Sequence, residues 1–397
     1  MAVTRPTTLS IKYFLIVFIW LLFACLCSLQ VSAAILPEDR ADALYHAYSG
    51  GGVTVDGPSV LVRKGFKDKV SVYANYYIDM VSSASIDVLS SGSKYTEERT
   101  EYSVGGEYLI DRTILSLGYG KSDESDYTAE TTSVGISQEF FGSMSTLSMG
   151  FSQGDDIVRQ NQRDGPPIQV GEIKRRRFTL SWTQVLTKNL IAAVNTETIV
   201  DDGFLRNPYR QVRVLGETDQ FEIYPETRNS DAASLRLMYY LPYRASIRLE
   251  GRYFSDSWGI KASNYEIRYM HPLKENWTFE VKLRTYSQTQ ADFYQDLFVF
   301  PEGEARPAFL GRDKELSTYQ ANNFGFGVTY ERASQWKYFT KESVNFFWDY
   351  MQFDYDNFRN RLLSRGTDTS PAQFAVGEEP FYGFNANIVR LFVSLYY

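Results

Sequence analysis

The chain has 397 residues, with 41 Lys and Arg against 48 Asp and Glu, so its formal charge at neutral pH is −7. This charge argues against a general nucleic-acid binder, which needs a basic surface. Aromatic residues make up 16% of the chain, and a mean hydropathy of −0.31 is too polar for a bundle of membrane helices. Abundant Tyr, Phe and Gly instead favour β-strands.

The first 34 residues predict a secretory signal peptide. Arg5 and Lys12 form a short basic region, an apolar run covers 13–26, and small residues at 31–34 offer a cleavage site. The alternatives are a retained membrane anchor and a lipoprotein signal with lipid on Cys25. Cleavage near residue 34 removes both cysteines of the chain, and with them disulfide and thiolate chemistry.

Residues 35–69 come before the long strand pattern. Residues 36–46 have the spacing of a short helix, a Gly-rich hinge follows at 50–52, and 59–64 form a short extended piece. We therefore assign 35–69 to a periplasmic N-terminal segment or plug, and 70–397 to the domain in the membrane.

From Val70 onward, apolar and polar side chains alternate with a period of two. The first such stretch runs for about twelve residues, longer than the usual strand of a soluble protein. The pattern recurs, and the fourteen predicted strands are 70–81, 100–109, 113–121, 131–140, 144–153, 173–186, 190–200, 231–241, 244–255, 259–271, 277–289, 319–332, 341–354 and 384–397.

Connectors between the predicted strands alternate between short and long, with one exception at 256–258. Short turns at one end and long loops at the other are typical of outer-membrane barrels, and an even strand count places both termini in the periplasm. The fold we expect is all-β, a transmembrane antiparallel β-barrel of about 14 strands, with 12 and 16 as alternatives. A closed sheet leaves no unpaired backbone edge in lipid.

The C-terminus carries the most specific signal of a barrel. Val393 and Leu395 lie on one face of the last predicted strand, and the chain ends on an aromatic residue, Tyr397. This looks like the terminal strand that the barrel-assembly machinery recognises. That machinery is an expected partner, together with outer-membrane lipid and lipopolysaccharide.

Several segments resemble the domain-of-unknown-function family numbered 3570. They are 39–46 (DRADALYH), 50–58 (GGGVTVDGP), 62–64 (VRK), 82–88 (SSASIDV), 122–129 (SDESDYTA) and 207–210 (NPYR). The resemblance implies an exported protein of the Gram-negative outer membrane. It also implies an association with small lipoproteins, thioredoxin-like proteins and flavin transferases, and so a periplasmic or lipoprotein partner in an envelope redox system.

Enzymatic chemistry has little support in the sequence. The mature chain has two histidines, His46 before the predicted barrel and His271 in a predicted periplasmic turn, so neither is expected to reach an extracellular active site. Metal sites built from Cys and His are excluded, because cleavage removes both cysteines and leaves only these two histidines. Asp123, Glu124 and Asp126 share one predicted outer loop and are weak candidates for a divalent cation, the alternative being a solvated acidic loop. No cofactor is expected.

Charged residues recur at positions that would face the lumen. On the C-terminal wall they are Arg236, Arg244, Arg248, Glu250, Arg252, Glu266, Arg268, Glu280, Lys282 and Arg284, and on the N-terminal wall they are Asp79, Glu101, Glu107 and Glu139. A basic wall facing an acidic wall would orient and filter small solutes. The alternative is a lumen closed by salt bridges.

Two functions follow from this pattern. The first is an outer-membrane channel for small polar or charged solutes. The second is a non-conducting structural or scaffold barrel of a cell-envelope complex. An enzyme is not expected.

Overall fold

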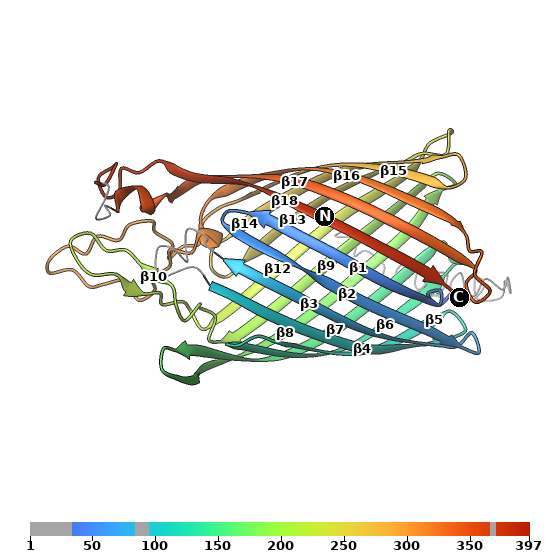
Figure 1. The fold of residues 1–397 in the computed structure, drawn as a ribbon, viewed down its shortest axis with the longest axis horizontal. Coiled ribbons are helices and arrows are strands. Elements are labelled where there is room, and N and C mark those ends of the chain that lie inside the picture. Colours follow the sequence, from blue (N-terminus) through green and yellow to red (C-terminus); the bar gives the residue numbers. More distant parts are fainter. Residues whose placement is uncertain (1–33, 84–94, 366–370) are drawn as a thin grey trace, which may run out of the picture.

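A computed structural model describes residues 34–83, 95–365 and 371–397, which form a closed antiparallel barrel of sixteen strands (Figure 1). The strands are β1 (Arg40–Gly50), β2 (Val53–Phe66), β3 (Val70–Ser83), β4 (Tyr95–Ile110), β5 (Thr113–Asp123), β6 (Tyr127–Phe140), β7 (Ser145–Gln162), β8 (Gly165–Thr187), β9 (Leu190–Gly203), β12 (Thr227–Tyr240), β13 (Ser246–Asp256), β14 (Lys261–Leu273), β15 (Trp277–Gln288), β16 (Tyr319–Ala333), β17 (Lys341–Arg359) and β18 (Phe381–Tyr396). The predicted all-β barrel is therefore confirmed, with sixteen strands and not fourteen.

The two additional strands are β1 and β2, so the expectation of a plug at 35–69 is wrong. β1 pairs with β18 on one side and with β2 on the other, and this pairing closes the barrel. The expected helix over 36–46 is instead mostly β1, whose outward positions are largely alanine and give a weak strand signal. The expected hinge is a tight hairpin turn, in which Gly51 and Gly52 both have positive φ.

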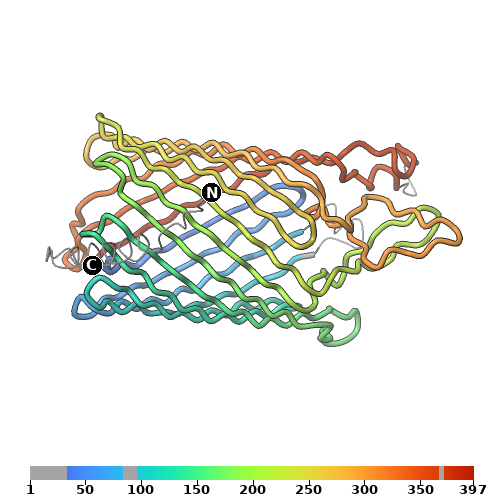
Figure 2. The backbone as a smooth tube through the Cα atoms, turned by 180° about the vertical axis from the view of Figure 1, so that it is seen from behind, coloured from blue at the N-terminus to red at the C-terminus, as the bar shows by residue number. Residues whose placement is uncertain are grey.

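The connections sort by length onto the two ends of the barrel. At one end the strands are joined by short turns such as 111–112 and 188–189, and the C-terminus lies there too (Figures 1 and 2). The opposite end carries three long segments, which we name loop A (204–226), loop B (289–318) and loop C (360–380). Long loops of outer-membrane barrels are extracellular, and the two ends are named accordingly.

The long loops contain short ordered elements. Loop A holds the strand pair β10 (Gln211–Val212) and β11 (Gln220–Phe221), while loops B and C hold the 3-10 helices η1 (Lys314–Leu316) and η2 (Arg361–Ser364). A long loop was expected at 154–172, but β7 and β8 extend through it and leave only 163–164 as a connection.

An apolar band covers the outer face of the wall. On β16 four alternate positions from Phe324 to Tyr330 face outward, between Asn322 and Arg332. Ten residues of a strand tilted by about 45° span about 24 Å, which matches the apolar height of an outer membrane. No helix among the described residues is long and apolar enough to cross a membrane.

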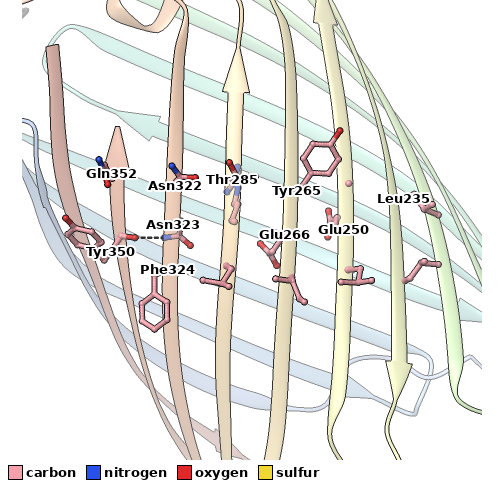
Figure 3. Close-up of a pocket in the computed structure, with 16 residues that line it drawn as sticks. Leu235, Glu250, Tyr265, Glu266, Thr285, Asn322, Asn323, Phe324, Tyr350 and Gln352 are labelled. Carbon is pink, nitrogen blue, oxygen red and sulfur yellow. Dashed lines mark hydrogen bonds between the residues drawn. The ribbon is translucent and has the colours of Figure 1, made fainter. Parts of the chain in front are cut away.

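A groove of about 690 Å³ lies on this outer face, across β12 to β17 (Figure 3). It is bordered by inward residues of these strands, Glu250, Glu266, Arg284 and Asn323. Most of its side chains come from outward positions, among them Leu235, Tyr265 and Phe324, which are 49%, 61% and 41% exposed. Gly251, which has no side chain, lies among them. The groove belongs to the membrane face, so we look for a functional site inside the barrel.

The last residue ties the closing strands together. The Tyr397 hydroxyl donates to the Arg63 carbonyl on β2 at 2.8 Å, and the Lys64 ammonium lies 4.9 Å from the centre of the Tyr397 ring. Val393 and Leu395 face outward on β18, as their alternation predicts. Their recognition by the assembly machinery stays a prediction.

Candidate functional site

Ion pairs join neighbouring strands on the inner face of β12 to β15. They involve residues that the alternation placed in the lumen, at positions opposite the outward apolar row. The nitrogen–oxygen pairs are Arg236–Glu250 (2.7 Å), Arg248–Glu266 (2.5 Å) and Arg268–Glu280 (2.8 Å). Adjacent opposite charges stabilise a sheet, and here they form a ladder around one arc of the lumen.

Three more basic side chains of this arc bond other residues of the wall. Arg252 bonds Glu197 of β9 at 2.8 Å and keeps 45% of its side chain exposed. Arg284 is also exposed, and its Nε donates to the amide oxygen of Asn264. Lys282 bonds a buried carboxylate of β17, Asp349. With the pair Arg228–Asp256 near the rim included, seven bases and four acids therefore occupy the inner face of β12 to β15.

Two residues that the alternation placed in the lumen lie at its periplasmic end. Arg244 belongs to the turn 241–245, where its φ of 68° takes it out of the strand alternation, so its predicted lumen position is wrong. Glu139, next to the end of β6, accepts a hydrogen bond from the Ser143 hydroxyl at 2.5 Å in the following turn.

The N-terminal wall is not the acidic surface that we expected. Glu107 bonds Arg63 of β2 at 3.0 Å, and Glu101 bonds Arg99 of its own strand at 2.7 Å. Arg63 was missed because β2 had been assigned to a plug. These basic partners neutralise the predicted acidic residues, so the field across the lumen is weaker than the sequence suggested.

Asp79 bonds the histidine of β1 across a glycine. His46, Gly57 and Asp79 share one row on three neighbouring strands. Gly57 has no side chain, so His46 Nε2 reaches Asp79 Oδ1 at 2.7 Å, and the imidazole stacks on Tyr77 with 5.0 Å between ring centres. His46 thus lies inside the lumen, and its expected place before the barrel is wrong. His271 lies within β14 and bonds Tyr269.

The middle of one arc of the wall presents small side chains to the lumen. The inward positions on β5 and β6 include Ser116, Gly118, Ser133 and Gly135, which pair across the two strands. The middle of this arc therefore adds little bulk of its own to the lumen, although the Tyr73 hydroxyl of β3 reaches over it and would meet a Cβ atom at Gly118 at 3.3 Å.

Loops A, B and C are held together above the barrel by a buried ionic network. Arg213 of loop A, whose side chain is 5% exposed, bonds Glu379 of loop C at 2.6 Å and also bonds Asp296 of loop B. Arg312 of loop B bonds the same aspartate at 2.9 Å. A buried charge is tolerated only when it is paired, so the network fixes the three loops relative to one another.

The same network sets the ionisation of Glu379. Burial by itself would raise the pKa of this carboxyl, but hydrogen bonds from Arg213 and Ser364 outweigh it and lower the pKa to about 2. Glu379 also accepts from the Gly377 amide at 2.9 Å.

Loop B descends to the rim of the barrel at η1. The Gln288 amide of β15 donates to the carbonyls of Glu315 and Ser317, both at 2.8 Å, and Asp313 caps the 3-10 helix. Leu316 is buried there in an apolar core with Trp258 and other aromatic residues. η1 is thus held over the mouth.

A cavity of about 610 Å³ remains beside η1, and we name it the outer vestibule. It is bounded by the β1–β2 hairpin with Tyr48 and Gly51, by Arg175 and Asp201 of β8 and β9, and by Lys314 of η1. Because these elements come from different sides of the barrel rim, the vestibule lies at the extracellular entrance to the lumen.

The structure brings two of the three metal candidates together. Glu124 and Asp126 lie with Glu97 so that one oxygen of each is within 4.8 Å of the others, while Asp123 lies near Lys121 on β5 and is not among them. Burial and then the nearby Glu97 raise the pKa of Glu124, and burial also raises that of Asp126. The Tyr209 hydroxyl donates to Asp126 at 2.7 Å. The acidic group thus already has protein partners.

The residues of the vestibule were missed by the sequence analysis, since most lie at strand ends or in loops without a periodic pattern. Composition gives no signal either, because the share of aromatic residues in loops A and B is close to the 16% of the whole chain.

Residues 86–342 match the model of a family described as "Protein of unknown function (DUF3570)". No curated protein matches the sequence. Part of the quoted resemblance, the segment 84–88, lies outside the described residues, as does the predicted signal segment up to residue 33.

Solved structures of outer-membrane proteins are similar at low identity. A bacterial polysaccharide outer membrane secretin has 8% identity and a TM-score of 0.46, covering 91% of this chain and 100% of its own. The siderophore receptor PirA from Pseudomonas aeruginosa has 10% identity and a TM-score of 0.44, with 82% and 60% covered. CdiB from Acinetobacter baumannii has 8% identity and a TM-score of 0.46, covering 90% of this chain and 60% of its own. This chain spans 60% of the latter two.

Proposed function

Because the chain belongs to the DUF3570 family of proteins of unknown function, its activity must be inferred from its own geometry, and we propose that it is an outer-membrane channel for small polar or charged solutes. It reaches the membrane through cleavage of the signal segment 1–34. It acts without a cofactor and is not an enzyme.

The observation that carries the proposal is a charged, solvent-accessible inner wall in a barrel of sixteen strands. Barrels with sixteen to eighteen strands are wide enough for an aqueous channel. Arg236 and Arg252 keep 36% and 45% of their side chains exposed although they form ion pairs. Among the described residues, the segment before β1 is only 34–39, which is too short to fill such a lumen.

The histidine inside the lumen does not change this proposal. His46 Nε2 is occupied by Asp79 and by the Tyr77 hydroxyl at 3.0 Å. The other ring nitrogen, Nδ1, is buried without a hydrogen-bond partner among the described residues, whereas a general base must contact a nucleophile or a water. The cluster therefore supports a structural role in the wall.

Purified protein in planar lipid bilayers tests the proposal directly. We expect discrete current steps whose size rises with salt concentration, because ions would cross a water-filled lumen. The control is the same preparation unfolded by boiling, which should give no steps. A folded barrel that stays silent in many insertions would contradict the channel and would favour the scaffold with a periplasmic or lipoprotein partner.

A further inference from the structure

We propose that the outer vestibule is a binding site for a neutral, ring-shaped polyhydroxy solute, a mono- or disaccharide. The inference rests on the proposed channel, because it names the class of solute that would enter it. It is argued from the size, the charge and the aromatic lining of the cavity.

The size of the vestibule suits a small ligand. Its volume of about 610 Å³ lies within the range of about 300–1,000 Å³ that is typical of small-molecule sites. The walls are fixed: the hydrogen bonds of Gln288 hold η1 on one side, and the Gly51–Gly52 hairpin closes the other. A preformed cavity loses little free energy to ordering when a ligand binds.

Aromatic side chains form much of the lining. They come from the inner faces of strands, from loop A and from the turn 257–260, and they are Tyr48, Tyr224, Trp258, Tyr319, Phe353, Tyr355 and Phe384. The rings of Phe353 and Phe384 stack with 4.6 Å between their centres, so each covers one face of the other, and the pair lines the vestibule as an apolar aromatic platform. An aromatic surface of this kind offers contacts to the C–H groups of a sugar ring.

The charged groups of the lining balance one another. Arg175 bonds Asp201 at 2.8 Å, and Arg228 bonds Asp256 at 2.6 Å, so each guanidinium already has a carboxylate partner. Arg175 nevertheless keeps 48% of its side chain exposed. Donors and acceptors are therefore available without a net charge, which favours hydroxyl groups over a carboxylate, a phosphate or an ammonium.

Isothermal titration calorimetry of the detergent-purified full barrel tests the proposal. Glucose and maltose are the probes. Sodium benzoate, an aromatic anion, and choline, a cation, are the charged ligands for comparison. We expect saturable heat with at least one of the sugars, at a dissociation constant of about 1 mM or lower. Phe384→Ala removes half of the platform and should weaken binding at least about tenfold. Lys314→Gln, a second variant on a different wall, should weaken it several-fold.

Arg332→Gln is the matched control, because Arg332 bonds Glu342 at the periplasmic end of the barrel and should leave sugar binding unchanged. Migration of unboiled protein on gels shows that each variant is folded. No saturable heat with either sugar, tighter binding of benzoate or choline, or binding that neither vestibule variant weakens would overturn the proposal. A barrel that conducts but does not bind sugar would refute this inference alone, whereas a silent barrel that binds sugar would refute only the channel.

Discussion

Glu379 shows how one carboxylate can control a large loop assembly. Its side chain is fully buried, and Arg213 connects it to Asp296 on a different loop. The pKa of about 2 means that this carboxylate is ionised wherever the folded loops exist at ordinary pH. Removing its charge leaves Arg213 with one carboxylate partner in place of two.

We expect Glu379→Gln to loosen loops A, B and C without unfolding the barrel, at a cost of about 2–3 kcal/mol in the local stability of the loops. Limited proteolysis at pH 7 measures this, since loosened loops should be cut several-fold faster. Glu302→Gln, at an exposed position of loop B, is the control and should be cut at the wild-type rate. Equal cutting of all three proteins would contradict the structural role.

The lowered pKa also predicts a dependence on pH. A carboxyl group whose folded pKa lies below its ordinary value adds stability above that ordinary value, and this stability is lost as the pH falls through about 2. The difference between wild type and Glu379→Gln should therefore be full at pH 7 and narrow towards pH 2. Pepsin at pH 2.5 makes the acid measurement, and an undiminished difference would contradict the assigned pKa.

At the scale of the element, β2 depends on a glycine where three strands meet. A Cβ atom at Gly57 would lie 1.9 Å from the Ile78 carbonyl oxygen of β3. Pro58, the next residue, has no amide hydrogen for the ladder, and the pairing of β2 with β3 is interrupted at these two residues. Gly57 allows β2 to approach β3 closely. The Gly57–Pro58 pair also interrupts the alternation of apolar and polar residues, so the sequence pattern does not reveal the strand.

Gly57→Ala should therefore lower the midpoint temperature of unfolding by several degrees, because the added methyl group displaces backbone and separates His46 from Asp79. The loss of heat-modifiable gel migration with temperature measures the midpoint. Gly120→Ala is the matched control, since a Cβ there meets its nearest neighbour at 3.6 Å, an ordinary contact. A midpoint for Gly57→Ala equal to that of the control would argue against the close packing of β2 on β3.

At the scale of the whole molecule, charge is distributed unevenly around the lumen. β12 to β15 carry seven bases and four acids on their inner face, whereas β5 and β6 offer mostly Ser, Thr and Gly. Permeating ions in the lumen would thus pass a basic arc on one side. The strength of that arc should set ion selectivity.

Arg252→Glu reverses one charge of the arc and should raise the cation-to-anion permeability ratio by about twofold or more. Glu197 keeps Arg177 as a partner, so the variant should still fold. Reversal potentials in a salt gradient across a planar bilayer give the ratio. Arg332→Glu changes a residue outside the lumen and should leave the permeability ratio unchanged. Equal ratios in the two variants would contradict the placement of Arg252 in the lumen.

The sequence by itself determined the class of fold, an all-β closed barrel, and the sorting of most connectors by length, because a strand between lipid and water must alternate residue by residue. The expected strand count of about fourteen fell short of the sixteen strands of the structure. On the same basis Arg236, Arg248 and Glu266 were predicted to face the lumen, and the structure pairs them with charged residues of neighbouring strands. Alternation failed at β1 and β2, where alanines and the Gly57–Pro58 pair weaken it, and at Arg244, which lies in a turn.

Only the tertiary structure decided which charges meet and what lies at the mouth. Arg63 with Glu107, His46 with Asp79, and Arg213 with Glu379 come from residues 33 to 166 positions apart. Their pairing follows from strand register and loop folding, and no local pattern records either. The alternation of apolar and polar residues indicates whether a side chain faces lipid or the aqueous lumen. The closure of the barrel decides which side chains lie close to one another in that lumen.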